Sequence, residues 1–315
     1  MDYTKAYEEL TEKIKYHMSK YYDEDTPEIS DREYDELMMK LKEMEKEHPE
    51  LVKEDSPTRI IGGSTKRTAG VNVEHDVPML SIQDVFTKEE VEEWILEVQA
   101  LHPDALFDVE QKIDGLSMSI RYENGVLRLA ETRGDGLVGE DVTENALVIE
   151  DVVKELSEKE DYLEVRGEVY MTHESFEKTN AGQELYGRKI FANPRNCAAG
   201  TLRQLDSAVV RQRKLSMFIF NVQKGSEAYM TSHARSLKKL CEIQGMKTVP
   251  SRLCRDVSEI MEEIDRIGNL RGQLPYDIDG AVIKVDNVAY RDDFPAGSKY
   301  SAGHIAYKYP PEEKE

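Results

Sequence analysis

The chain has 315 residues, of which 39% are hydrophobic and 33% are charged, so it is long enough for one large domain and one small domain. Its apolar runs are much shorter than a membrane span and it begins without a signal segment, so we expect no membrane association and a cytoplasmic location. A net charge of -21 argues against nucleic-acid binding by the surface as a whole, so any such partner must meet a local basic patch.

Two amphipathic helices are predicted near the amino terminus, over residues 3 to 20 and 31 to 48. The second opens with Ser30-Asp31-Arg32-Glu33, a capping-box pattern. Residues 55 to 78 contain Ser-Pro and Gly-Gly pairs that break all periodicity, which predicts a linker or wrapping loop. We place a domain boundary near residue 69, giving domains over 1–69 and 70–315.

The remainder of the chain is predicted to be α+β, with antiparallel sheets flanked by helices. Thr87 is the expected cap of a helix, and Glu123-Asn124-Gly125 indicates a hairpin between two strands. Helices and strands follow without the regular alternation of a doubly wound fold. Further strands are predicted over 162–171, 214–222 and 279–285, and further helices over 232–244 and 257–270. The three cysteines, Cys197, Cys241 and Cys254, are too widely spaced for a zinc cluster or disulfide framework, so we expect reduced, mostly buried thiols.

The most informative segment is Glu110-Gln111-Lys112-Ile113-Asp114-Gly115, at the end of a strand-like run. Strand alternation puts Glu110, Lys112 and Asp114 on one face, which places a lysine nucleophile between two carboxylates. The alternative is a surface ladder of salt bridges that ends in an Asp-Gly turn, because short patterns of this kind also occur by chance.

Several charged residues in strand-like or glycine-rich segments could share a site with Lys112: Arg133, Glu168, Lys284 and Lys308. Lys284 could instead form a simple buried ion pair with Glu168. Cations gathered near carboxylates suggest a polyanionic ligand, since phosphoryl chemistry uses them to position phosphates beside a carboxylate-bound magnesium ion. We expect the neighbouring cations to lower the pKa of Lys112 from its ordinary value of about 10.4, which makes its amine a better nucleophile.

A basic stretch runs from Arg188 to Lys214, where seven lysines and arginines face a single acid, Asp206. This stretch is the candidate nucleic-acid patch. It could equally be an ordinary solvated face.

Several longer strings resemble those of bacterial NAD+-dependent DNA ligases, in the same order and over essentially the whole chain. They are Pro78 to Ile82, Lys112 to Gly115, Thr132 to Gly136, Gly139 to Thr143, Phe191 to Asn196, Ala199 to Asp206 and Asp279 to Val285. The resemblance implies a nucleotidyltransferase domain over 70–315 and a helical nicotinamide mononucleotide-binding domain over 1–69. It also implies that Lys112 attacks the α-phosphate of NAD+ and becomes adenylated, the magnesium-dependent first step of nick sealing in DNA replication and repair.

The resemblance also implies roles for individual residues. The predicted catalytic residues are Lys112, Asp114 and Lys284, with Asp114 acting through magnesium or in later nick sealing; no metal ligand is assigned. Glu110 would read the adenine amino group, Arg133 and Glu168 would lie near the ribose and phosphates, and Lys284 and Lys308 would contact the α-phosphate. Ser81 and Ile82 are also expected at the nucleotide, and Phe220 is expected to stack on adenine in place of the usual tyrosine.

A further set resembles the family's cradle for nicotinamide mononucleotide: Tyr21, Tyr22, Asp31, Tyr34 and Asp35. Nicotinamide in NAD+ is an aromatic cation, which tyrosine rings can stack on and carboxylates can pair with. Asp31, Tyr34 and Asp35 share one helical face. Alternatively, Asp31 is a helix cap and Tyr34 a core residue.

Besides Phe220, the chain departs from the family pattern in two further places. Ser301 to His304 stand where relatives read Pro-Arg-Trp-Ala, which removes a cation and a large aromatic, and Tyr22 replaces a frequent histidine. Full ligases also continue beyond position 315 into DNA-clamping modules, so we expect the adenylation portion alone: a monomer that binds nicked duplex DNA weakly. Two alternatives are an ATP- or GTP-using relative and a nucleotide-binding module without catalysis.

Overall fold

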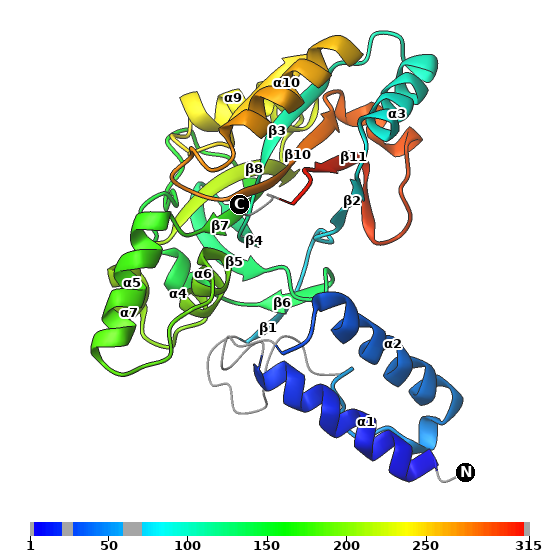
Figure 1. Cartoon of the computed structure of the whole chain (residues 1–315). Coiled ribbons are helices and arrows are strands. Elements are labelled where there is room, and N and C mark those ends of the chain that lie inside the picture. The colour runs from blue at the N-terminus through cyan, green and yellow to red at the C-terminus, as the bar shows by residue number, and fades with distance from the viewer. Residues whose placement is uncertain (1–2, 21–27, 59–70, 312–315) are drawn as a thin grey trace.

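The computed structural model describes residues 3–20, 28–58 and 71–311, without the side chains of Asp31, Arg32 and Asp35, and its architecture is α+β (Figure 1). Of the helices in these ranges, none is both long and apolar enough to cross a membrane. The three cysteines carry free thiols; Cys197 and Cys254 are buried and Cys241 is exposed.

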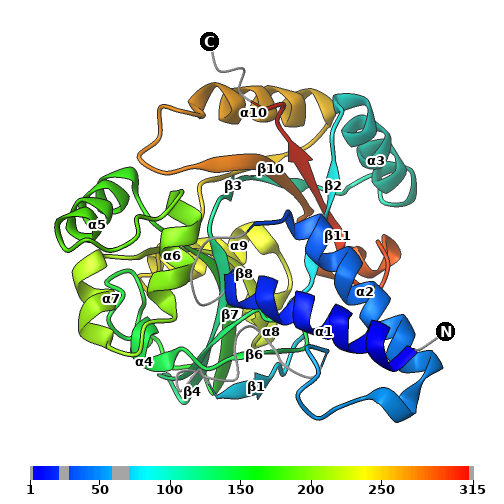
Figure 2. The ribbon, with the colours of Figure 1, turned by 60° about the horizontal axis from the view of Figure 1, so that its bottom comes forward.

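Two helices, α1 (Tyr3–Met18) and α2 (Asp31–Glu47), pack side by side, and the short 3-10 helix η2 (Pro49–Leu51) follows them (Figures 1 and 2). The predicted capping box is confirmed, because Ser30 Oγ accepts a hydrogen bond from the Glu33 amide and the Glu33 carboxylate accepts one from the Ser30 amide. The pair has a small core of its own, made by Tyr7, Ile14, Met18 and Leu41.

A five-stranded sheet forms one wall of the rest of the molecule. Its strand order is β2 (Ser81–Val85), β11 (Tyr300–Lys308), β10 (Ile278–Val285), β3 (Phe107–Ile113) and β9 (Ser251–Cys254). Neighbouring strands are antiparallel except β2 and β11, which are parallel, a pairing absent from the predicted antiparallel sheets. Helices α3 (Lys88–Leu101), capped by Thr87 as predicted, and α10 (Val257–Leu270) cover its outer side (Figure 2).

A four-stranded antiparallel sheet forms the other wall. Its order is β5 (Val126–Thr132), β4 (Leu116–Glu123), β7 (Tyr162–Tyr170) and β8 (Ser216–Lys224), and the predicted hairpin joins β4 to β5. The helices around it are α4 (Thr143–Ala146), α5 (His173–Leu185), α6 (Pro194–Leu202), α7 (Ser207–Arg213), α8 (Glu227–Met230) and α9 (His233–Glu242). Helices α4 to α7 gather at one end of this sheet (Figure 1).

The predicted loop over residues 55 to 78 is partly wrong. Strand β1 (Asn72–Glu74) pairs with β6 (Val138–Glu140) in a small antiparallel sheet, while residues 59–70 lie outside the described ranges. Short strands of three residues carry too little alternation to be read from sequence. The pairing fixes the path of the chain into β2.

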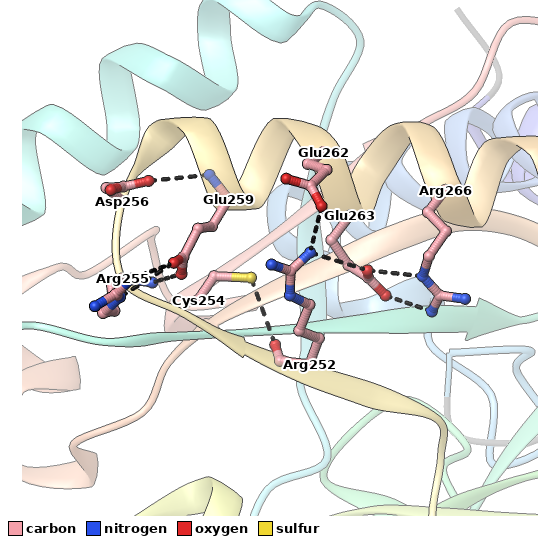
Figure 3. A network of polar contacts seen from close by, with 8 residues as sticks. All are labelled: Arg252, Cys254, Arg255, Asp256, Glu259, Glu262, Glu263 and Arg266. Carbon is pink, nitrogen blue, oxygen red and sulfur yellow. Dashed lines mark hydrogen bonds and ion pairs between the residues drawn. The ribbon is translucent and has the colours of Figure 1, made fainter.

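An ion-pair network holds the edge strand β9 beneath α10 (Figure 3). The Arg252 guanidinium lies 3.2 Å from Glu262 and 3.8 Å from Glu263, and Arg266 also pairs with Glu263. Because Glu263 is buried, its charge requires such partners. The network thereby fixes the neighbour of β3, the strand that carries Lys112.

The altered stretch Ser301 to His304 lies inside β11 and does not interrupt it. Within this stretch Gly303 has φ +71°, a conformation that favours glycine. A Cβ there would lie 2.7 to 3.0 Å from atoms of Arg291, which belongs to the 3-10 helix η3 (Val288–Asp293). The close approach of β11 to η3 therefore requires glycine at this position.

Replacing Gly303 by alanine should lower the free energy of unfolding by about 1–3 kcal/mol, measured by urea denaturation, because the new methyl group would be strained and crowded. Gly182→Ala in α5, where a Cβ meets nothing within 4 Å, is the control and should not destabilise the protein. Equal stabilities of the two variants would show that Gly303 is not required for the contact between β11 and η3.

Candidate active site

A cleft of about 620 Å³ lies between the two large sheets. It brings together every site residue predicted beyond position 70: Ser81, Ile82, Glu110, Lys112, Asp114, Arg133, Glu168, Phe220, Lys284 and Lys308. They come from segments that are far apart in the sequence. The lining also contains Arg166 and Asp279, which sequence reasoning had given no role, and Arg195 and Arg203, which it had assigned to the candidate nucleic-acid patch.

The pairing of β3 with β10 organises the floor of the cleft. Lys112 lies opposite Gly280, Glu110 opposite Val282 and Asp108 opposite Lys284, so the predicted alternation of β3 is confirmed and Lys284 shares its charged face. A Cβ at Gly280 would lie 2.5 Å from the Tyr307 carbonyl oxygen and 3.4 Å from Cδ of Lys112. Glycine at this position therefore permits the close approach of the β11 backbone at Tyr307.

Lys112 lies among carboxylates at one end of the cleft. Its Nζ is 3.5 Å from Asp279 Oδ1, while Asp279 Oδ2 accepts a 2.6 Å hydrogen bond from Lys308 Nζ. Burial alone would lower the pKa of Lys112, but the charges of Asp279 and Glu168 outweigh it and raise this pKa. The prediction of a lowered pKa is thus wrong for the free protein, because nearby acids dominate over the expected cations.

Two carboxyl groups near Lys112, those of Glu168 and Asp114, have raised pKa values, whereas Lys112 and Lys308 overcome burial and lower the pKa of Asp279. Burial raises the pKa of Glu168 to about 7, although the charges of Lys112 and Arg166 act in the opposite direction. Burial also raises the pKa of Asp114, whose Oδ1 lies 4.0 Å from Nε of Arg195. Near neutral pH, Glu168 is therefore able to gain or lose a proton beside the lysine.

Glu110 and Lys284 form a buried ion pair at the other end of the cleft. Lys284 Nζ lies 2.7 Å from Glu110 Oε1 and donates to the Phe220 carbonyl oxygen at 2.6 Å. The alternative pairing of Lys284 with Glu168 is wrong, because β10 places Lys284 beside β3. Contact between Lys284 and an α-phosphate remains a prediction.

Two arginines that line the cleft hold the chain segment that leads into β2. Arg133 donates to the Met79 carbonyl oxygen at 3.1 Å and to Ser81 Oγ at 2.5 Å, and Arg166 donates to the Leu80 carbonyl oxygen at 2.8 Å. The Phe220 ring lies 5.5 Å from the Arg166 guanidinium carbon. Arg166 alternates with Glu168 along one strand, a signal that could have assigned both residues to one face.

The predicted nicotinamide cradle is only partly described. Tyr21 and Tyr22 lie outside the described residues, and so do the side chains of Asp31 and Asp35. Tyr34 packs against the small amino-terminal core, and Ser30 rather than Asp31 caps α2. The role of these five residues stays a prediction.

The basic stretch from Arg188 to Lys214 divides between two environments. Arg195 and Arg203 line the cleft, and Arg213 donates to Thr201 Oγ1 and lies over the Phe191 ring. The remaining cations, Arg188, Lys189, Arg211 and Lys214, are exposed. The candidate nucleic-acid patch is therefore smaller than its sequence suggests.

Residues beside Lys112 suit a nucleotide-borne magnesium ion. Asp279 Oδ1 is buried and accepts no hydrogen bond, and Asp114 and Glu168 line the same end of the cleft. No group of three or more ligating side chains is preassembled for a metal among the described residues. Magnesium commonly binds one or two carboxylates together with substrate phosphates, and this set fits that arrangement.

Residues 68–312 match the model of the NAD-dependent DNA ligase adenylation domain. The chain belongs to this family. Residues 1–62 match the DNA ligase-like, N-terminal NAD+-binding domain, so the resemblance noted from the motifs is confirmed.

Among curated relatives, the DNA ligase of Clostridium kluyveri is 45% identical over 316 residues, covering 100% of this chain and 47% of that protein. The DNA ligase of Acetivibrio thermocellus is 47% identical over 318 residues, covering 100% and 48%. This adenylation-domain chain thus spans about half the length of these relatives. The solved ATP-dependent DNA ligase from bacteriophage T7 in complex with ATP has a TM-score of 0.38 at 13% identity, covering 74% of this chain and 70% of that one.

The buried Glu110–Lys284 pair predicts a pH-dependent loss of stability in Lys284→Met. At pH 8 the variant leaves the Glu110 charge with fewer partners, so its free energy of unfolding should fall by about 3 kcal/mol. In the intact protein Lys284 and His233 overcome burial and hold the pKa of Glu110 below its ordinary value. The ionised Glu110 therefore stabilises the folded protein at pH values above that ordinary value, and this stabilisation is lost as the pH falls through the folded-state pKa. The difference between variant and unaltered protein should therefore shrink toward pH 4 in urea denaturation.

The matched control is Lys238→Met, which alters an exposed lysine. It should change stability by less than about 0.5 kcal/mol at either pH. A Lys284→Met loss that stays constant from pH 8 to pH 4 would show that packing, and not the ion pair, explains it.

Proposed function

We propose that this chain is the adenylation portion of an NAD+-dependent DNA ligase and transfers AMP from NAD+ to Lys112. The observation that carries the proposal is the cleft that unites Lys112 with residues of matching chemistry. Glu110 and Phe220 at one end suit a base, and Lys112, Lys308 and Arg195 at the other end suit phosphates. The family's NAD+ chemistry accounts for the donor.

In the proposed reaction the neutral Lys112 amine attacks the α-phosphorus of NAD+. A nitrogen–phosphorus bond forms, the bond from phosphorus to the bridging oxygen breaks, and nicotinamide mononucleotide leaves with the electron pair. One proton leaves the attacking nitrogen as the phosphoramidate forms and passes to solvent. Lys308 and the arginines of the cleft would hold the phosphate oxygens as negative charge develops on them.

Deprotonation of Lys112 is the step that the free site disfavours, because its carboxylates raise the lysine pKa. We propose that Glu168, with a pKa of about 7, accepts a proton near Lys112. Phosphates that engage Lys308 would also compete with its hydrogen bond to Asp279. Bound magnesium would supply positive charge that neutralises the phosphates, and Asp114 and Asp279 are the proposed residues to hold it.

We also propose the division into domains over 1–69 and 70–315. The separate hydrophobic core of α1 and α2 supports it. In this proposal the helical domain binds the nicotinamide mononucleotide half through Tyr21, Tyr22, Asp31, Tyr34 and Asp35. The larger domain binds the AMP half.

The partners and location of the protein are further proposals. The full-length ligase would seal nicks in duplex DNA, and this chain alone would bind DNA weakly, since only five exposed cations of the basic stretch oppose a net charge of -21. A monomeric state and a cytoplasmic location remain predictions.

Incubation with NAD+ and magnesium should add one adenylyl group to the protein, seen by intact mass spectrometry. Lys112→Ala removes the nucleophile and should abolish the adduct, whereas Lys238→Ala should retain it. Noncovalent binding of NAD+ without any adduct in the unaltered protein would refute the proposed catalysis.

Replacing Tyr34 by alanine should abolish labelling by NAD+, or reduce it at least about tenfold, because the ring would no longer stack on nicotinamide. Tyr34→Phe keeps the ring and should stay active. Since Tyr34 also packs in the amino-terminal core, Met38→Ala, which truncates a neighbour packed against the same core, controls for lost packing. Unchanged labelling of Tyr34→Ala would exclude Tyr34 from the cradle.

A further inference from the structure

His233 lies behind the base-reading end of the cleft and contacts Glu110 directly. Its Nε2 is 2.6 Å from Glu110 Oε2, while Lys284 Nζ is 2.7 Å from Oε1. The three side chains are each no more than 2% exposed. Each oxygen of Glu110 therefore has its own buried partner, and sequence reasoning had given His233 no role.

The imidazole of His233 is neutral. Burial lowers its pKa to about 4, and the positive charge of Lys284 acts in the same direction. A neutral ring that faces an ionised carboxylate at this distance must carry its proton on Nε2 and donate it. Glu110 is thus held as a hydrogen-bond acceptor from two sides.

The surrounding charges balance this arrangement. The other groups facing it are Asp108, Asp286, Arg291 and His304. Burial raises the pKa of Asp108 to about 10 and lowers that of His304 well below its usual range, so both are neutral near pH 7. Two cations, Lys284 and Arg291, then face two anions, Glu110 and Asp286. Because these charges balance, Glu110 can stay ionised.

The backbone fixes the position of His233. It is the first residue of α9, and its amide donates to the Asp286 carbonyl oxygen at 2.9 Å. The Asp286 carboxylate accepts from the Ala234 amide at 2.7 Å and from Ser232 Oγ at 2.9 Å. Asp286 directly follows β10, the strand that carries Lys284, so both partners of Glu110 are held by one anchor.

We propose that His233 is a positioning residue that sets the specificity of the site for a 6-amino purine. The inference rests on the proposed function, in which Glu110 accepts a hydrogen bond from the adenine amino group. With donors on both oxygens, Glu110 remains a pure acceptor, and its free lone pairs match an amino group. A 6-oxo purine would present an oxygen to that carboxylate and leave both groups unpaired.

Removing the His233 donor should relax this discrimination. Glu110 would keep only Lys284, and burial would raise its pKa, so that part of the population would be a neutral acid. A neutral acid can donate a hydrogen bond to a 6-oxo group. Preference for adenine should therefore fall, most strongly toward lower pH.

The experiment compares single-turnover adenylation by NAD+ and by its hypoxanthine analogue, read by intact mass spectrometry between pH 6 and pH 8. The unaltered protein should prefer NAD+ by about 100-fold or more. His233→Leu should lose at least about tenfold of this preference. His233→Gln, whose amide can donate from nearly the same position as Nε2, should keep it, and Lys238→Ala on the exposed side of α9 is the control for the helix.

The outcomes separate the two proposals. An unaltered protein that NAD+ does not adenylate refutes the proposed function itself. If adenylation occurs but His233→Leu slows both dinucleotides equally, His233 has a structural role only and the inference is wrong. Should His233→Leu fail to fold, His233→Asn replaces it, because the shorter amide of asparagine does not reach Glu110. A preference for NAD+ that His233→Gln retains and His233→Asn loses supports the inference. An equal preference for NAD+ in both variants overturns it.

Discussion

The antiparallel pairing of β3 with β10 determines the geometry of the site. Side chains on one face of a strand are spaced by about 7 Å, which sets how far Lys112 lies from Glu110 along β3. The pairing sets how far both residues lie from Lys284 on β10. It also puts Gly280 opposite Lys112, at a position where a larger residue would collide with the Tyr307 carbonyl oxygen. A register slip of one residue would turn the charged face into the hydrophobic core, so the buried charges themselves enforce the register.

The two ends of the cleft use burial differently. At the Glu110 end, an ionised carboxylate is held between a lysine and a neutral histidine, and its charge is fixed over a wide pH range. At the Lys112 end, burial is incomplete and carboxylates outweigh desolvation, so the charges can change near neutral pH. A fixed charge suits recognition, and a changeable one suits proton transfer.

Much of the fold could be predicted from local patterns. The alternation of β3, the hairpin after Glu123 and the capped helices α2 and α3 depend on neighbours in sequence, and the structure confirms them. Helices α6 and α7 escape prediction because their short, small-residue sequences show no apolar period. The parallel pairing of β2 with β11 joins residues more than two hundred positions apart, which no local pattern encodes.

In the candidate site, too, local patterns predict some features and tertiary structure determines the others. The residue types in the cleft could be named from motifs, but their partners could not. Lys284 meets Glu110 because strand order places them side by side, and Asp279 raises the pKa of Lys112 because β10 lies against β3. Both facts arise from tertiary structure, and so does the contact between His233 and Glu110.

Sheet connectivity has a consequence for biosynthesis. The five-stranded sheet takes β2 from residue 81 and β11 from residue 308, and β11 lies between β2 and β10. During translation the early strand β2 stays unpaired at this edge until β11 has left the ribosome. Such late, long-range closure slows folding and leaves backbone groups at the open sheet edge unpaired until β11 arrives.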